Sequence, residues 1–148
     1  MFDNLNDLYQ QVILDHSKSP RNFGELPGAD HRAQGRNPLC GDQVSVSVKM
    51  NGQVIEDIRF QGSGCAIAKA SASVMTTALK GKTLQEARKL FEEFHEFVKT
   101  GQAPCEGLGK LDVFGGVHHY PARVKCAILA WHAAIAALAD NPNPVTTE

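Results

Sequence analysis

The sequence predicts an α+β fold, in which a small antiparallel β-sheet of about three strands has helices packed on one face. Two observations indicate this fold. Residues 43–50 alternate valine with serine or lysine, and Asn51-Gly52 then precedes a second strand-like run. This pattern is typical of a β-hairpin that buries only one of its faces. Segments with apolar residues at helical spacing lie before and after the hairpin, so helices are expected to cover the buried face.

The chain before the hairpin is expected to contain one helix and one short strand. Residues 3–17 are predicted to form the helix, because apolar side chains recur there at i, i+3 and i+4 spacing. Pro20 ends it, and residues 18–30 form a loop containing proline and glycine. Residues 31–36 are expected to form a short edge strand. The apolar stripe of the helix consists of Phe2, Leu5, Leu8, Tyr9, Val12 and Ile13.

Two helices are predicted directly after the hairpin. The return strand, residues 53–61, is followed by Gly-Ser-Gly and then by a helix over residues 65–80. The next helix opens with Thr83 and Glu86, which have the spacing of a capping box. Its apolar stripe is typical of an amphipathic helix. That stripe comprises Leu84, Ala87, Leu90, Phe91, Phe94 and Phe97 or Val98.

The last part of the chain is expected to contain a long loop and one helix. Residues 100–120 are predicted to be mostly loop, with one helical turn near residues 107–113 as an alternative for that part. Pro121 suits the first position of a helix, which we place over residues 121–139. We therefore expect a single domain over residues 1–140, followed by a flexible tail over residues 141–148.

Composition and charge argue against several classes of protein. The chain has 148 residues, of which 43% are hydrophobic, enough for the core of one domain. The net charge is −1 and the basic residues are scattered, unlike the basic face of a nucleic-acid-binding protein. We see neither an apolar run of bilayer length nor the pattern of a signal peptide. We therefore expect a cytoplasmic protein without nucleic-acid or membrane partners, whose cysteines are ligands or reactive thiols.

Three of the four cysteines are predicted to converge at one end of the sheet. Cys40 precedes the first hairpin strand and Cys65 follows the second, and in an antiparallel hairpin these two positions lie side by side. Asp42 lies at the same end. If the start of the last helix leans over that end, it adds Cys126. Three thiolates and a carboxylate suit Zn²⁺ or the iron of an iron–sulfur cluster, so the sequence predicts a metal site.

The electrostatic setting favours this site, although each residue has another interpretation. Cys65 and, more weakly, Cys126 lie near predicted helix N-termini, which favour the thiolate form. Asp42 is a harder donor than a thiolate, which would make the site easier to open; alternatively it stabilises a turn. A cysteine taken singly is often a small buried hydrophobe, which is our interpretation of Cys105.

The histidines and the tryptophan are expected to lie outside the site. His118 and His119 are expected in a solvated loop, the alternative being that they complete a metal site. Trp131 is expected to anchor the core or an interface from the last helix. Structural or surface roles are expected for His16, His31, His95 and His132.

Three segments together resemble a known family. They are "NPLCGD" (37–42), "GSGCAIAKASASVM" (62–75) and "ARVKCAILAW" (122–131), and they resemble the U-type iron–sulfur assembly proteins, the IscU/SufU/NifU N-terminal family. The resemblance covers nearly the whole chain. It is greatest to the SufU branch, because Lys125 stands where IscU proteins have histidine and the Leu-Pro-Pro-Val-Lys chaperone motif is absent.

The resemblance implies a role in iron–sulfur cluster assembly. It implies that the protein receives sulfur from a SufS-like cysteine desulfurase and works with downstream iron–sulfur assembly or acceptor proteins. It also implies that Cys40, Asp42, Cys65 and Cys126 bind Zn²⁺, or alternatively iron or a transient 2Fe–2S cluster. Cys40 is our candidate for the sulfur acceptor, because its loop can move more easily than a cysteine at a helix start.

Three hypotheses for the function follow. The first is a zinc-dependent sulfurtransferase. The second is a scaffold that assembles a transient 2Fe–2S cluster on Cys40, Cys65 and Cys126 and passes it to apo-proteins. The third is a small protein with a closed, purely structural zinc site. The sequence does not separate the first two, because both use the same ligands.

Overall fold

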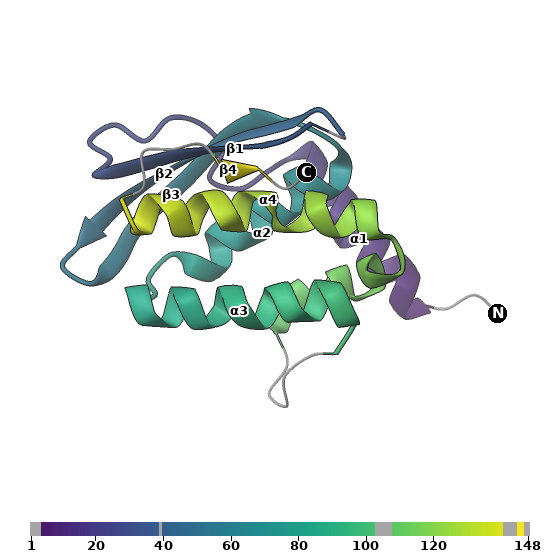
Figure 1. The fold of residues 1–148 in the computed structure, drawn as a ribbon. Coiled ribbons are helices and arrows are strands. Elements are labelled where there is room, and N and C mark those ends of the chain that lie inside the picture. Colours follow the sequence, from purple (N-terminus) through teal and green to yellow (C-terminus); the bar gives the residue numbers. More distant parts are fainter. Residues whose placement is uncertain (1–3, 39, 103–107, 141–144, 147–148) are drawn as a thin grey trace.

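The computed structural model describes residues 4–38, 40–102, 108–140 and 145–146. These residues form a four-stranded sheet with the strand order β3-β2-β1-β4. Figure 1 shows the sheet as one layer and the helices gathered on one side of it. The predicted α+β class is therefore confirmed.

The three predicted strands are present and pair as expected. β1 (His31–Asn37) is antiparallel to β2 (Asp42–Asn51), which is antiparallel to β3 (Val54–Ser63). The alternation in β2 places one row of side chains in the core, as predicted from the valine–serine pattern. The buried row consists of Val44, Val46 and Val48.

The hairpin turn lies one residue later than the sequence suggested. Asn51 still pairs with the opposite strand, so Gly52 and Gln53 form the two-residue loop. The register also shifts between Lys49 and Met50, where β3 contains one extra residue. Gly52 has a φ of 62°, a left-handed conformation that favours glycine.

A fourth strand makes the sheet mixed rather than purely antiparallel. β4 (Val145–Thr146) pairs in parallel with Gly35 and Arg36 of β1. We expected no strand in this tail, because two residues are too few to show a periodic pattern. Gly35 leaves room for the contact, since a Cβ atom there would lie 3.1 Å from Val145 and from Leu129. Residues 141–144 and 147–148 of the predicted tail lie outside the described residues.

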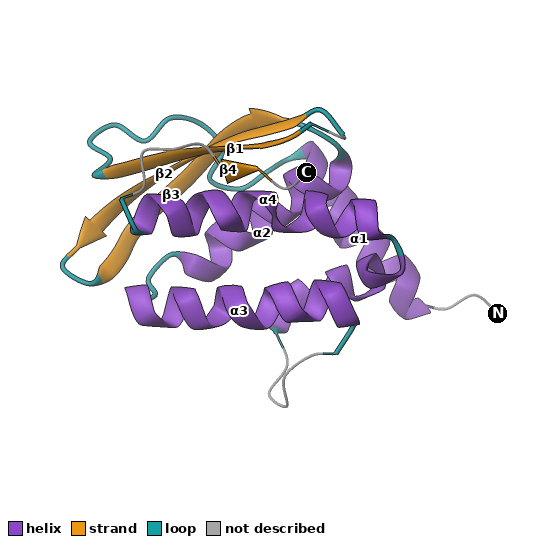
Figure 2. Ribbon diagram, in the orientation of Figure 1, coloured by secondary structure: helices purple, strands orange, loops and turns teal. Residues whose placement is uncertain are grey.

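Two helices cover the sheet and two pack on those helices. α4 (Pro121–Leu138) lies against β1 and β2, and α2 (Ala66–Leu79) lies against β3. α1 (Asn4–Lys18) packs on α2, and α3 (Leu84–Thr100) packs on α4 (Figure 2). The four predicted helices are thus confirmed to within one or two residues at their ends.

α1 is attached to α2 by apolar and polar contacts. Of its predicted stripe, Tyr9, Val12 and Ile13 pack against the core. The ring Nδ1 of His16, a buried residue, lies 2.7 Å from the Ser73 Oγ atom of α2. These contacts support the structural role expected for His16. Phe2 lies outside the described residues, as do the side chains of Leu5 and Leu8.

α3 begins with the predicted capping box. The Thr83 hydroxyl accepts a hydrogen bond from the Glu86 N–H at 3.1 Å, and the Thr83 N–H donates to the Glu86 carboxylate at 2.9 Å. Gly101 ends the helix in the left-handed conformation, with a φ of 80°. The predicted stripe faces the core, and its fully buried members are Ala87, Phe94, Phe97 and Val98.

The segment expected to be mostly loop forms a long 3₁₀-helix, η1 (Gly109–His119). The helical turn expected near residues 107–113 is thus part of a longer helix, and the prediction of a loop was wrong for the rest of this range. Leu111, Phe114 and Val117 are three residues apart, which matches the three residues per turn of a 3₁₀-helix. All three side chains are buried. Phe114 also makes an edge-to-face contact with Phe94 of α3, so core packing holds this helix in place.

α4 is the central helix of the core. Trp131 is fully buried, stacks on Phe94 and donates its indole N–H to the Ser71 hydroxyl at 3.2 Å. It is therefore a core anchor. By length and composition alone, Pro121–Leu138 could span a membrane. Its most apolar window is 61% buried inside the protein, as expected for a core helix.

Candidate metal centre

Four segments meet at one end of the sheet, and each brings one of the predicted site residues. Cys40 lies on the turn between β1 and β2, and Asp42 is the first residue of β2. Cys65 is the N-cap of α2. Cys126 lies in the second turn of α4. The hairpin register and the position of the α4 start therefore bring the four predicted ligands together.

The distances between the side chains suit one small ion. The Sγ atoms of Cys40 and Cys126 lie 3.4 Å apart. One ligand atom from each of Cys40, Asp42 and Cys126 lies within 4.8 Å of the others. The Sγ of Cys65 lies 4.0 Å from Asp42 Oδ2. Tetrahedral Zn²⁺ with Zn–S bonds of about 2.3 Å holds its sulfurs ~3.7 Å apart, so the donor set fits zinc in chemistry and in spacing.

Asp42 is held at the site by the start of α2. Its Oδ1 accepts a hydrogen bond from the Cys65 backbone N–H at 2.9 Å. The side chain is only 1% exposed. One carboxylate oxygen thus binds the backbone, while the other faces Cys65 Sγ. This long-range contact is unlike the local turn that was the alternative interpretation of Asp42.

Glycines make room for this arrangement. A Cβ atom on Gly64 would lie 2.6 Å from Asp42 Oδ1, so only glycine leaves the carboxylate in its present place. Gly41 has a φ of 70°, which permits the bend between Cys40 and Asp42. Gly62, with a φ of 147°, lets β3 pass close to the Gln43 carbonyl oxygen.

The thiols differ in environment. The Cys65 Sγ accepts a hydrogen bond from the Ala68 N–H at 3.5 Å, so the first turn of α2 holds this sulfur in place. Burial raises the pKa of the Cys126 thiol, and the neighbouring Asp42, Cys40 and Cys65 groups raise this pKa further. Burial therefore outweighs the weak helix field expected at Cys126. A bound cation would offset this crowding of acidic groups, so the arrangement favours binding of a metal ion.

Exposure decreases from one cysteine to the next across the site. Cys40 is exposed, Cys65 is half-buried and Cys126 is buried. A ligand set closed on all sides would bury all three. This site has a floor made by Cys126 and Asp42 and an open side at Cys40, so a partner molecule can approach Cys40 from solvent.

The sequence matches the family described as NifU-like N terminal domain over residues 8–127. The chain belongs to this family. It is 43% identical over 140 residues to a Streptococcus pyogenes protein named "Iron-sulfur cluster assembly scaffold protein IscU", covering 94% of this chain and 87% of that protein. It is 41% identical over 131 residues to the Bacillus subtilis "Zinc-dependent sulfurtransferase SufU", covering 88% of each.

A solved structure agrees with this assignment. A putative iron–sulfur cluster assembly scaffold protein for the SUF system from Fervidobacterium islandicum AW-1 superposes with a TM-score of 0.83 at 34% identity. The match covers 90% of this chain and 98% of that one. The NifU-like fold is therefore shared along nearly the whole chain, while the similar identities to the IscU and SufU relatives do not by themselves separate the two branches.

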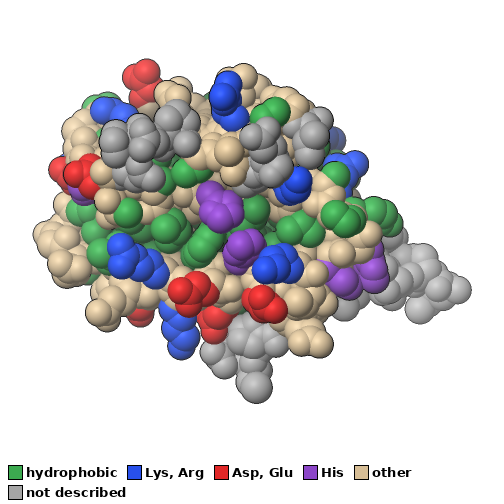
Figure 3. All heavy atoms as spheres, in the orientation of Figure 1, with side chains coloured by type: hydrophobic (Ala, Val, Ile, Leu, Met, Phe, Trp, Pro, Cys, Tyr) green, Lys and Arg blue, Asp and Glu red, His purple; other side chains and the backbone are tan. Residues whose placement is uncertain are grey.

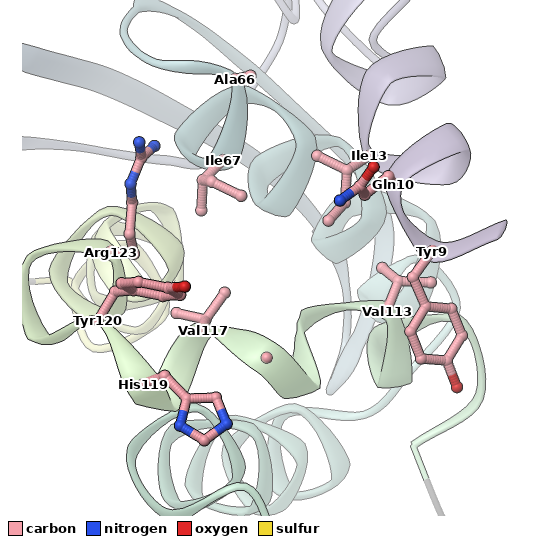
Figure 4. Close-up of a pocket in the computed structure, with 11 residues that line it drawn as sticks. Tyr9, Gln10, Ile13, Ala66, Ile67, Val113, Val117, His119, Tyr120 and Arg123 are labelled. Atoms are coloured by element: carbon pink, nitrogen blue, oxygen red, sulfur yellow. The ribbon is translucent and has the colours of Figure 1, made fainter. Parts of the chain in front are cut away.

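A cavity of about 600 Å³ lies beside the candidate metal centre of this NifU-like protein. Figure 4 shows Ile67 and Val117 pointing into it, with Tyr120 and Arg123 on one side. Ile67 follows Cys65 by two residues, and Arg123 precedes Cys126 by three. Two residues that line the cavity therefore lie within three positions of a predicted ligand in the chain. Its opposite wall comes from α1, with Tyr9, Gln10 and Ile13.

The predicted non-ligand residues take different places. Cys105 lies outside the described residues. His118 and His119 lie on η1 with their ring centroids 3.9 Å apart. Neither belongs to the group of metal-ligating side chains found in the described part of the chain. His118 is half-buried, and its Nδ1 lies 2.6 Å from the Gly115 carbonyl oxygen. It is therefore held by a contact within η1 and does not lie in a solvated loop.

A second pair of histidines joins α3 and α4. His95 of α3 and His132 of α4 have ring centroids 5.4 Å apart, and Phe91 contacts both rings. Figure 3 shows histidines beside hydrophobic side chains on one face of the molecule, with acidic and basic side chains interspersed on that face. This face therefore has no continuous basic surface.

One buried polar residue beside the ligands was missed by the sequence analysis. Asn37 Nδ2 donates a hydrogen bond to Cys126 Sγ at 3.7 Å. The signal was present, because inward-facing residues alternate along β1. Those residues are Ala33, Gly35 and Asn37. Our prediction ended this strand one residue too early and left Asn37 in the turn.

Proposed function

We propose that this NifU-like protein accepts sulfur from the persulfide of a SufS-like cysteine desulfurase at a zinc site formed by Cys40, Asp42, Cys65 and Cys126. The observation that carries this proposal is the exposed Cys40 thiol, which lies 3.4 Å from the buried Cys126 thiol. These two residues and Asp42 form a group of metal-ligating side chains, and the Cys65 Sγ lies 4.0 Å from Asp42 Oδ2 beside it. An exposed thiol at the edge of a metal site can react with a partner, whereas a closed site cannot.

The chain supplies the ligands and the means of holding them. Asp42 is fixed by the Cys65 N–H, and Cys65 is fixed as the N-cap of α2. Zn²⁺ bound at this site would keep the thiols as thiolates at neutral pH and shield them from oxidation. Because Asp42 is a harder donor than a thiolate, it would bind the ion less strongly than a fourth cysteine would.

The transfer step is a thiol–persulfide exchange. The Cys40 thiolate attacks the outer sulfur of the donor's persulfide. A new S–S bond forms on Cys40, the S–S bond of the donor breaks, and the donor's cysteine leaves as a thiolate. The electrons balance without an external oxidant or reductant. Gly41 next to Cys40 gives the turn the conformational freedom for Cys40 to reach outward.

One relative and one residue of this chain support the proposal. The Bacillus subtilis relative, 41% identical, is named a zinc-dependent sulfurtransferase. Lys125, directly before Cys126, is the residue that resembles the SufU branch. A cytoplasmic location and downstream iron–sulfur assembly or acceptor proteins as partners remain part of the proposal.

A second candidate function is a scaffold that assembles a transient 2Fe–2S cluster as cargo on the same cysteines. The donor set also suits iron, and the weaker Asp42 ligand would ease release of the cluster to an apo-protein. The Streptococcus pyogenes relative, 43% identical, is named as such a scaffold. A purely structural zinc site fits less well, because Cys40 is exposed and structural sites are closed.

Anaerobic reconstitution separates these functions. Protein freed of metal is incubated with desulfurase and cysteine, with either Zn²⁺ or iron added. The sulfurtransferase proposal expects faster desulfurase turnover that needs Zn²⁺, and no visible charge-transfer spectrum with iron. A stable cluster spectrum and activation of an apo-protein would instead support the scaffold. Unchanged turnover with Zn²⁺ together with no cluster spectrum with iron would contradict both functions.

A further inference from the structure

Asn37 occupies a buried position between two of the proposed ligands. It is the last residue of β1, and none of its surface is exposed. Its backbone pairs with Asp42. Its carbonyl oxygen accepts a hydrogen bond from the Cys40 N–H at 3.2 Å. Asn37 therefore lies at the base of the turn that carries Cys40.

The side-chain amide of Asn37 faces Cys126, another of the proposed ligands. Nδ2 donates a hydrogen bond to Cys126 Sγ at 3.7 Å. Oδ1 is buried and has no hydrogen-bond partner among the residues that the structure describes. An unpartnered buried amide oxygen is unfavourable, and an apolar side chain of similar size would avoid it. The contact of Nδ2 with sulfur offers a reason for an amide at this position.

We propose that Asn37 is a positioning residue that donates an N–H···S hydrogen bond to the Cys126 thiolate when the site holds a metal. This inference rests on the proposed ligand role of Cys126. The bond fixes the direction of the sulfur and draws negative charge away from it, which reduces donation from the thiolate to the metal. In the scaffold function, the same bond would tune the reduction potential of the cluster, because hydrogen bonds to cluster sulfurs do so.

The role of the Asn37 side-chain amide can be tested without removing the backbone contacts of this residue. The hydrogen bond between the Cys40 N–H and the Asn37 carbonyl involves backbone atoms, so it is kept by any residue at position 37. Asn37 has no positive φ, so other residues can adopt its backbone conformation. Replacing Asn37 by leucine removes the donor and the unpartnered oxygen together and keeps the branching at Cγ, with a larger side-chain volume.

The direct experiment needs no substitution. Protein labelled with nitrogen-15 is loaded with cadmium-113, which replaces Zn²⁺ and is observed by NMR. The proposal expects a scalar coupling between the metal and the Asn37 side-chain amide protons, transmitted through the hydrogen bond and the Cys126 sulfur. A cadmium shift typical of three sulfur ligands without this coupling would overturn the role of Asn37 alone. Absence of scalar coupling between cadmium and the Cys126 Hβ protons would show that Cys126 does not bind, and would overturn the ligand assignment and this inference together.

A variant gives an independent readout. In Co²⁺-loaded protein, Asn37→Leu should shift the thiolate-to-metal charge-transfer band to lower energy, because the sulfur regains electron density. The matched control is Gln43→Leu, which makes the same polar-to-apolar change at an exposed position of β2. That control should leave the band in place. An unshifted band in a folded Asn37→Leu protein would contradict the proposal, since a merely structural role does not predict the shift.

Discussion

The Sγ atoms of Cys40 and Cys126 lie 3.4 Å apart, although one thiol is exposed and the other is 1% exposed. This pair therefore connects the exposed side of the site, at Cys40, with its buried side, at Cys126. It also makes the metal-free site vulnerable to oxidation, since two close thiols need little movement to form a disulfide.

Metal-free protein should therefore form a Cys40–Cys126 disulfide when treated with hydrogen peroxide. The oxidant converts one thiol to a sulfenic acid, and the second thiol displaces water from it. Peptide mapping by mass spectrometry identifies the linked pair. Protein loaded with Zn²⁺ should react much more slowly. Equal rates with and without Zn²⁺, or a disulfide between other cysteines, would contradict the shared site.

Gly64→Ala should weaken metal binding while leaving the fold intact. The new Cβ atom would lie 2.6 Å from Asp42 Oδ1 and force the carboxylate to move. We expect at least a tenfold loss of Zn²⁺ affinity, about 1.4 kcal/mol, measured by competition with a chelator. The matched control is Gly116→Ala, where a Cβ atom meets nothing within 4 Å. Wild-type affinity in Gly64→Ala would argue against Asp42 as a ligand.

Tyr120→Ala should weaken the interaction with the sulfur donor without changing the metal. Tyr120 is 63% exposed and lines the cavity beside the site. Large exposed aromatic side chains often dominate the binding energy of interfaces. A higher protein concentration should be needed for half-maximal stimulation of the desulfurase. Leu14→Ala is the control, because Leu14 is similarly exposed at 45% but lies outside the cavity lining. Equal effects of both variants would contradict a role for this cavity.

Acid should destabilise the attachment of α1 through His16. Burial, followed by the charge of Arg21, lowers the pKa of His16 below its ordinary value of 6.5. The unfolded chain then binds this proton more readily than the folded one, so stability falls as the pH drops through about 6.5 towards the lowered value. His16→Gln should show a shallower fall in unfolding free energy between neutral and acidic pH. The contribution of metal ligands is common to both proteins, so parallel pH profiles would contradict the assignment.

The sequence allowed the site to be predicted better than its surroundings. Counting residues back from the hairpin turn placed Cys40 and Cys65 at one end of the sheet, and that result is insensitive to the one-residue shift of the turn. Register is fixed by which face is buried, so the valine alternation in β2 carried the information. Asn37 was not predicted as part of the site, because its side chain contacts Cys126, which is 89 residues away in the chain.

The elements that were missed, in whole or in part, have a weak local signal. η1 is held by Leu111, Phe114 and Val117 packing on α3 and α4, and their three-residue spacing is too short a pattern to distinguish from a loop. β4 consists of two residues whose partner strand ends over a hundred positions earlier. The cavity beside the site is assembled from α1, α2, η1 and α4, so only the folded arrangement reveals it.

The central claim is that Cys40 receives sulfur at this site, and mass spectrometry of the zinc-loaded protein after reaction with desulfurase and cysteine tests it most directly. The account predicts one added sulfur on the peptide that contains Cys40, and none in Cys40→Ala, which should still fold because Cys40 is exposed. Normal sulfur uptake by Cys40→Ala, or sulfur found first on Cys65 or Cys126, would contradict the account.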